Sequence, residues 1–113
     1  MLSGSWKTAT IALNGQTSAE VDLDRQWERL LLVAPALDNA QISLEVAEKT
    51  GGTFQDLYMI LDADGTSAQI ITDTTTTAKT YILPLGGFQF VKIKASAAQT
   101  GGARAFRVCG IRS

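Results

Sequence analysis

The stretch that decides the fold is Gln41-Ile42-Ser43-Leu44-Glu45-Val46-Ala47. Apolar side chains stand at every second position, at Ile42, Leu44 and Val46, and more polar ones lie between them. Because successive side chains of a β-strand point to opposite faces of its sheet, this alternation predicts a strand with one face toward a core. The residues that follow, Glu48-Lys49-Thr50-Gly51-Gly52, are typical of a turn.

The same two-residue period extends toward the N-terminus. It predicts strands at 7–13 and 16–23, joined as a hairpin by Asn14-Gly15, because this residue pair suits a type I′ turn. The apolar run at 27–34 predicts a strand covered on both faces. A short buried helix over 24–32 is the alternative, and the proline that follows the run favours the strand.

The period also extends toward the C-terminus, with strands predicted at 54–61, 67–72, 79–83, 88–95 and 104–111. Within 88–95 the apolar positions shift by one residue, which predicts a β-bulge. Four consecutive threonines, Thr74 to Thr77, predict an exposed loop or sheet edge. Eight or nine short strands separated by Gly- and Asp-rich turns predict one all-β domain over 1–113, an antiparallel β-sandwich of jelly-roll type. Residues 1–6 are expected to form an N-terminal arm that extends from it.

Composition narrows the range of partners. The chain has 113 residues, a net charge of −1 and 45% hydrophobic residues, so no strong field draws it to nucleic acid or to an anionic membrane. The longest apolar run, 30–37, is too short to span a bilayer. The N-terminus lacks the apolar core of a signal peptide, so we expect a soluble protein made without an export signal.

Reactive residues are scarce. The chain has no histidine, which excludes Ser-His-Asp and Cys-His nucleophile systems. Cys109, the only cysteine, lies in a predicted strand and is expected to be a buried structural thiol. In Asp62-Ala63-Asp64-Gly65 the glycine is the fourth residue and not the sixth, so this turn does not match an EF-hand calcium loop. No spacing selects a pair among the remaining carboxylates. We therefore expect no catalytic residue, no cofactor and no metal site, and a protein that is not an enzyme.

Four motifs occur in an order that resembles a known family. They are Asn14-Gly15-Gln16-Thr17-Ser18-Ala19, Gly52-Thr53-Phe54-Gln55-Asp56-Leu57-Tyr58 with the later Asp64-Gly65-Thr66, Leu85-Gly86-Gly87-Phe88-Gln89-Phe90-Val91-Lys92-Ile93, and Gln99 with Arg104. Together they resemble small proteins encoded among the structural genes of tailed phages and prophages. The chain departs from that family at Tyr58-Met59-Ile60-Leu61-Asp62, where its strand is longer.

The resemblance implies a virion structural protein with a β-sandwich fold, made in the host cytoplasm and located on the capsid surface. The expected role is a capsid decoration, or cement, protein that binds the major capsid protein and copies of itself as a trimer, with neither nucleic acid nor membrane as partner. A tail or baseplate accessory protein is an alternative. Another is a carbohydrate-binding adhesion module, which needs two or more coplanar exposed aromatic side chains. The residues expected at the interface are Leu2, Trp6, Leu30, Leu31 and Leu32.

Overall fold

The computed structural model describes residues 1–61 and 64–112. These residues contain eleven β-strands and no helix. The strands are β1 (Leu2–Ser3), β2 (Lys7–Ile11), β3 (Val21–Asp22), β4 (Arg29–Ala34), β5 (Ile42–Ala47), β6 (Gln55–Asp56), β7 (Tyr58–Ile60), β8 (Ser67–Gln69), β9 (Lys79–Pro84), β10 (Phe90–Ala95) and β11 (Arg104–Arg112). All of their pairings are antiparallel. The predicted all-β class is confirmed, and the alternative helix over 24–32 does not form.

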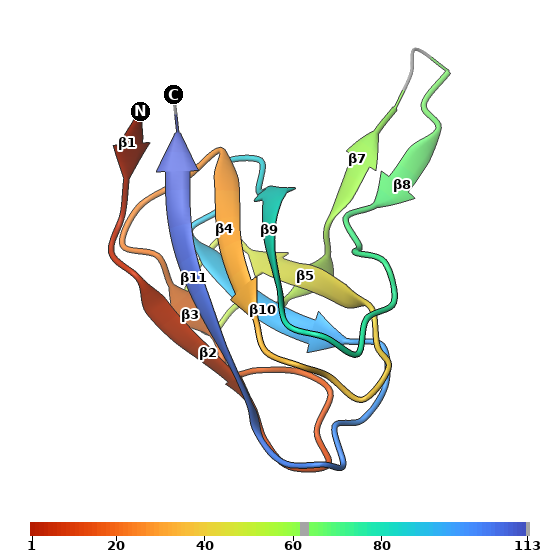
Figure 1. Ribbon diagram of the computed structural model, residues 1–113. Coiled ribbons are helices and arrows are strands. Elements are labelled where there is room, and N and C mark those ends of the chain that lie inside the picture. The colour runs from red at the N-terminus through yellow and green to blue at the C-terminus, as the bar shows by residue number, and fades with distance from the viewer. Residues whose placement is uncertain (62–63, 113) are drawn as a thin grey trace.

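Nine of the strands form two sheets, here called sheet A and sheet B (Figure 1). In sheet A, β1 and β2 lie one after the other along β11, followed by β4 and β9. In sheet B the order is β3, β10, β5 and β6. From β2 to β5, and again from β9 to β11, each strand lies in the opposite sheet from the one before it. This is the connectivity of a jelly roll, as the sequence predicts.

The core lies between the two sheets and draws on alternate residues of each strand. In β5 the predicted inward residues Ile42, Leu44 and Val46 are all buried, which confirms the alternation that decides the fold. The largest fully buried hydrophobic side chains come from both sheets: Ile11, Leu30, Leu32, Phe106 and Val108 from sheet A, and Ile42, Leu44, Val91 and Ile93 from sheet B. Burial of these two inner faces is the main stabilising term of the fold.

The predicted N-terminal hairpin is wrong. The turn forms, with Asn14 at a φ of 65° and the Gly15 amide donating to the Ala12 carbonyl over 2.8 Å. However, β2 pairs with β11 in sheet A, whereas β3 pairs with β10 in sheet B. The turn therefore carries the chain across the core from one sheet to the other. The residues of a turn predict that the chain reverses there, but they do not determine which strand each neighbouring strand pairs with. The turn is also not of type I′, because Gly15 lacks the positive φ that this type needs.

The prediction that the apolar run at 27–34 is covered on both faces is also wrong. The strand begins at Arg29, and only Leu30, Leu32 and Ala34 are buried. Val33 remains 39% exposed. Leu31 and Val33, which alternate with the buried residues, therefore face the outer side of sheet A.

The predicted strand at 54–61 is divided at Leu57. Its amide donates to the Leu44 carbonyl over 3.0 Å, at the edge of sheet B, and its carbonyl accepts from the Ile70 amide over 2.8 Å. Before Leu57 the chain pairs with β5 as β6, and after it the chain pairs only with β8 as β7. One strand in the sequence thus serves two different sheets.

One smaller expectation is corrected and another is confirmed in part. The shift of apolar positions within 88–95 is not a bulge inside a strand, because β10 begins only at Phe90 and Phe88 lies in the turn before it. Of the four threonines, Thr75 is 4% exposed and bridges Ala40, while the other three are exposed. The segment is thus mostly exposed, as predicted, and Thr75 ties it to the sandwich at Ala40.

Trp27 closes one end of the core. Its indole nitrogen donates to the Leu23 carbonyl over 3.0 Å, and the side chain is 3% exposed. The ring packs directly on the backbone of β11, where a Cβ at Gly110 would lie 2.2 Å from two ring atoms. The ring also lies against Gly4, where a Cβ would be 2.8 Å away. Two glycines therefore make room for one tryptophan.

Replacing Gly110 with alanine should destabilise the domain by about 1–3 kcal/mol, because the added methyl group must displace the indole ring. Urea denaturation of the wild type and of Gly110→Ala measures this difference. In a Trp27→Leu background the penalty should shrink, since the crowded ring is gone. An equal penalty in both backgrounds would show that the tryptophan is not the reason for the glycine.

Candidate interaction surface

The strands β7 and β8 form a separate two-stranded ribbon that projects from the sandwich (Figure 1). Within the described residues, β7 and β8 pair with each other and with no other strand. The register places Tyr58 opposite Gln69 and Ile60 opposite Ser67. The ribbon begins where the chain leaves sheet B at Leu57.

Four consecutive large apolar side chains of the ribbon are exposed. Tyr58 is 53% exposed, Met59 40%, Ile60 64% and Leu61 58%. Because side chains alternate along a strand, Tyr58 and Ile60 share one face of the ribbon while Met59 and Leu61 share the other. Both faces are thus apolar and uncovered. A clustered apolar surface of this kind marks an interaction site, and an isolated two-stranded ribbon is only marginally stable in water.

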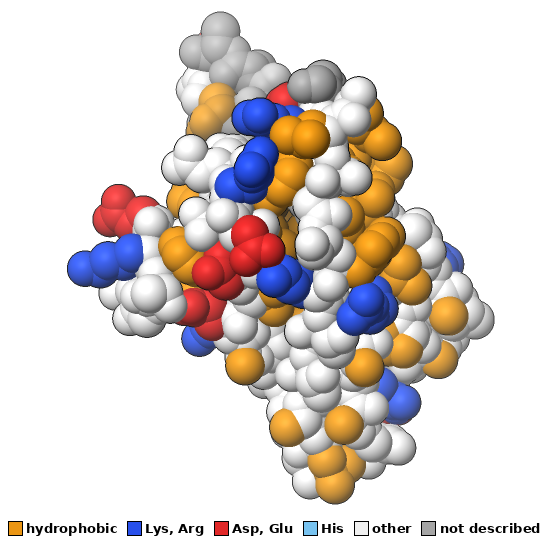
Figure 2. All heavy atoms as spheres, turned by 90° about the vertical axis from the view of Figure 1, so that its left-hand side faces the viewer, with side chains coloured by type: hydrophobic (Ala, Val, Ile, Leu, Met, Phe, Trp, Pro, Cys, Tyr) orange, Lys and Arg blue, Asp and Glu red, His pale blue; other side chains and the backbone are white. Residues whose placement is uncertain are grey.

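The outer face of sheet A carries a second uncovered apolar patch. Leu31 is half-buried and pairs across strands with Ile82, which is 62% exposed. Val33, two residues along β4, lies on the same face and is also exposed. Two cations, Arg29 and Arg107, occupy outward positions on the neighbouring parts of β4 and β11. Figure 2 views the molecule from the side of β1 to β3 and shows hydrophobic side chains in a band toward the right of the view, with Lys and Arg among them.

The predicted interface residues do not all reach the surface. Leu2 and Trp6 are 40% and 44% exposed, and Leu31 is half-buried on the outer face of sheet A. Leu30 and Leu32 are fully buried, so the prediction that they contact a partner is wrong. The apolar run is divided by strand alternation, which assigns every second leucine to the core.

Residues 1–6 do not form an arm that extends from the domain. Leu2 and Ser3 pair with β11 as β1, and the Gly4 amide donates to the Gly110 carbonyl over 2.9 Å. The Cys109 thiol donates to the Gly4 carbonyl over 3.3 Å, and this side chain is 2% exposed, as expected of a structural thiol. The first residues are therefore part of the edge of sheet A.

The outer face of sheet B differs from that of sheet A because it is charged and paired. Lys94 lies 3.8 Å from a Glu45 oxygen and 3.6 Å from an Asp56 oxygen. Lys92 stands over the ring of Phe54 at 4.5 Å from its centre. These contacts pair opposite charges within the face, although the buried Asp56 Oδ1 atom accepts no hydrogen bond among the described residues.

An open hollow of about 530 Å³ lies beside this face, between the turn after β5 and the turn before β10. The sugar-binding alternative requires a platform of two or more aromatic rings. Among the residues that line the hollow, Phe88 is the one aromatic, and it is half-buried. The hollow therefore does not provide such a platform.

The expectation about metal ligands concerns the turn 62–65, of which Asp62 and Ala63 lie outside the described residues. Within 1–61 and 64–112, no three or more His, Cys, Asp or Glu side chains gather closely enough to hold an ion. In the same ranges, no helix is long and apolar enough to cross a membrane.

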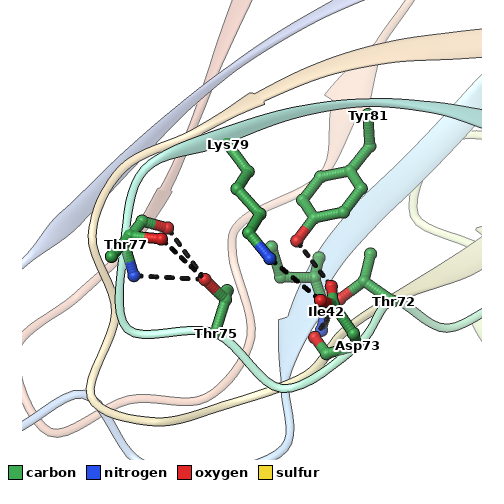
Figure 3. A network of polar contacts seen from close by, with 7 residues as sticks. All are labelled: Ile42, Thr72, Asp73, Thr75, Thr77, Lys79 and Tyr81. Atoms are coloured by element: carbon green, nitrogen blue, oxygen red, sulfur yellow. Dashed lines mark hydrogen bonds and ion pairs between the residues drawn. The ribbon is translucent and has the colours of Figure 1, made fainter.

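A polar network fixes the segment that follows the ribbon (Figure 3). The Asp73 carboxylate accepts from the Lys79 Nζ and from the Tyr81 hydroxyl, each over 2.9 Å. The neighbouring Thr72 hydroxyl accepts from the Ile42 amide of β5 over 2.9 Å. Because β9 carries Lys79 and Tyr81, the network joins sheet A to sheet B at the base of the ribbon. The ribbon thus projects from a braced support.

The network shifts the acid–base properties of its members. The hydrogen bonds from Lys79 and Tyr81 hold the pKa of Asp73 below its usual value of 3.8. The same bond and the Asp73 charge raise the pKa of Lys79, and burial together with the Asp73 bond raises the pKa of Tyr81. Near neutral pH all three groups are in the protonation states that the network needs.

Comparison with known proteins adds a fold and no family. No protein-family model and no curated protein matches the sequence. The crystal structure of the SPBc2 prophage-derived protein YomS shares the fold, with a TM-score of 0.57 and 11% identity over 99% of this chain and 96% of that one. Two structures are less similar. The Bacillus endospore appendages that form disulfide-linked pili have a TM-score of 0.42 and 13% identity, over 99% of this chain and 88% of that one. TmCBM61 in complex with β-1,4-galactotriose has a TM-score of 0.39 and 17% identity, over 92% of this chain and 69% of that one.

The Asp73 network should make the domain lose stability in acid. A carboxyl group whose pKa is lower in the folded chain than in the unfolded chain stabilises the fold above the unfolded pKa, and this contribution disappears as the pH falls through the folded pKa. Asp73→Asn should therefore flatten the stability curve below about pH 4. Urea denaturation at a series of pH values measures this, and superimposable curves for both proteins would contradict it.

The ribbon should exchange its amide hydrogens faster than the sandwich does. Amides of β7 and β8 should exchange at least about tenfold faster than those of β4 and β11, because few buried contacts hold the ribbon closed. Hydrogen-exchange mass spectrometry of peptides that cover 58–69 and 104–112 makes the comparison. Equal protection in both regions would show that the ribbon is as stable as the core.

Proposed function

We propose that this chain is a phage virion structural protein, not an enzyme, and that it attaches to a particle surface through the β7–β8 ribbon. The observation that carries the proposal is the row of four exposed apolar side chains, Tyr58 to Leu61, on a ribbon that no other part of the described chain covers. Such a surface gains free energy only when a partner removes it from water. The rigid sandwich holds it in place for that partner.

The specific role we propose is capsid decoration, with the major capsid protein as partner. A protein that binds the assembled shell and not the free subunits stabilises the shell by the free energy of that binding. Each contact need not be strong, because many copies act on the same lattice. A small domain with one projecting apolar ribbon meets this requirement.

Two lines of support favour a phage protein. The four ordered sequence motifs resemble small structural proteins of tailed phages, and the stretch where this chain departs from them, Tyr58 to Asp62, coincides with the ribbon as far as the structure describes it. The YomS structure shows that the fold occurs in a prophage-encoded protein. A tail or baseplate accessory protein could attach through the same ribbon. It would differ from a decoration protein in its location on the particle.

The proposal is tested with particles of the encoding phage that lack the protein. Adding back the wild-type chain should raise the temperature at which the particles release their DNA. Ile60→Glu should weaken binding about tenfold or more, because a charged side chain would be taken out of water at the contact. Measured occupancy and particle melting report the two effects.

Ile71→Glu is the matched control, since Ile71 is also exposed, at 41%, but lies on the outer side of sheet B beside Ser43. It should bind like the wild type. If Ile60→Glu bound the particles as tightly as the wild type, the ribbon would not be part of the contact. Particles that melt alike with and without the protein, together with its recovery on isolated tails, would replace capsid decoration with the tail role.

A further inference from the structure

We propose that the free edge of β9 pairs with β9 of a second copy, so that two copies of sheet A join into one continuous sheet across a two-fold axis. This inference goes beyond the proposed function and involves no residue of the ribbon. Sheet A ends at β9, which pairs with β4 alone. Figure 1 shows that no further strand of sheet A lies beyond it.

The ladder between β4 and β9 shows which backbone groups of β9 face the free side. Arg29 lies opposite Pro84, and one residue further along each strand the Leu85 amide donates to the Glu28 carbonyl over 2.8 Å. In an antiparallel ladder, this bond marks Arg29 and Pro84 as a non-hydrogen-bonded pair. The odd-numbered residues of β9 therefore bond to β4, and the backbone groups of the even-numbered residues point away from it.

The even-numbered residues are Thr80, Ile82 and Pro84. Among the described residues, the amides and carbonyls of Thr80 and Ile82 have no hydrogen-bond partner. Pro84 has no amide hydrogen, and its nitrogen lies on the free side, which is where an edge strand tolerates a proline. A row of unpaired amides and carbonyls is complementary to the backbone of an extended strand, so the occupant of this edge is a β-strand.

The edge is complementary to itself. When two copies of β9 pair antiparallel about Ile82, each Ile82 amide donates to the Ile82 carbonyl of the other copy. Each Thr80 amide then donates to the Pro84 carbonyl of the other copy. Every amide donor on the two free edges thus finds an acceptor, and the missing amide of Pro84 leaves no donor unpaired.

The side chains favour the same pairing. Ile82 is 62% exposed, and the two-fold axis places it beside the Ile82 of the other copy, so both are removed from water. The segment 80–84 contains no charged residue, and the net charge of the chain is −1, so two edges repel each other little. A lysine often protects an edge strand from pairing, but the Lys79 Nζ is bound to Asp73 over 2.9 Å.

The other strands at the margins of the two sheets offer shorter edges. β1, β3 and β6 have two residues each and β2 has five, whereas β9 has six. A two-fold contact closes on itself, so it produces a dimer, whereas the family resemblance implies a trimer. If the ribbon attaches as proposed above, such a dimer carries two ribbons, and binding of the first raises the effective concentration of the second.

The first test is sedimentation velocity and native mass spectrometry of the purified full-length chain, at concentrations up to about 1 mM because an edge contact buries little area. The wild type should form dimers. Ile82→Glu should stay monomeric, because two like charges would lie directly opposite each other at the axis. Val33→Glu is the matched control: Val33 is exposed on the same outer face but lies on β4, one strand in from the edge, so this variant should dimerise. Ile60→Glu should also dimerise, since the ribbon takes no part, and circular dichroism with a thermal melt checks that each variant is folded.

The second test uses disulfide cross-linking to check the register. Ile82→Cys should form a disulfide-linked dimer with oxidised glutathione, because the Cα atoms of a directly opposed pair lie about 5.5 Å apart. Thr80→Cys should not cross-link to itself, because Thr80 lies opposite Pro84 of the other copy. The native Cys109 is 2% exposed, and the wild type serves as the control for it.

Three results would overturn the inference: a wild type that stays monomeric at about 1 mM, an Ile82→Glu protein that dimerises like the wild type, or equal cross-linking by the two cysteine variants. None of these results bears on the ribbon, because the proposed function is tested by the binding of Ile60→Glu to particles. The two proposals therefore stand or fail separately.

Discussion

A β-sandwich buries one face of each strand, and this constraint governs the rest of the molecule. In β4 and β10 the buried residues alternate with more exposed ones, so only every second side chain of these strands enters the space between the sheets. Any stretch with consecutive apolar residues must then leave some of them outside. The run 30–33 does so on the outer face of sheet A, and Tyr58 to Leu61 does so on the ribbon. These exposed apolar surfaces are thus a direct product of the alternation that builds the core.

This constraint also explains what the sequence could and could not predict. Alternation at 41–47 predicts a strand and its inward face correctly, and the spacing of turns predicts a sandwich. Strand partners are not encoded locally. The turn at Asn14 is visible in the sequence, but β2 and β3 separate into different sheets because β2 pairs with β11, 93 to 101 residues away, and β3 pairs with β10, 68 to 70 residues away. The sequence likewise gives no local sign that the N-terminal residues pair with a strand, because their partner is β11 at the other end of the chain.

The exposed apolar surface of the ribbon could be predicted only in part from the sequence. Four apolar residues in a row at 58–61 break the two-residue period, and that break was the available signal for an uncovered ribbon. The same break occurs at 30–33, where two of the four side chains, Leu30 and Leu32, are buried in the core. The sequence alone does not say which face of the sheet remains exposed. Breaks in alternation mark candidate surfaces, and the fold decides which side chains of each break remain exposed.

The ribbon is held by fewer contacts than its support, and this difference matters for binding. The Asp73 network ties the base of the ribbon to both sheets, through Ile42 on one side and Tyr81 on the other. Beyond that base, the ribbon has a single ladder of two short strands and no buried layer. Ordering the ribbon in a complex costs free energy, since its own contacts hold it weakly. A partner must repay that cost with apolar burial, and a partner that covers both strands of the ribbon buries more apolar surface than one that contacts a single strand.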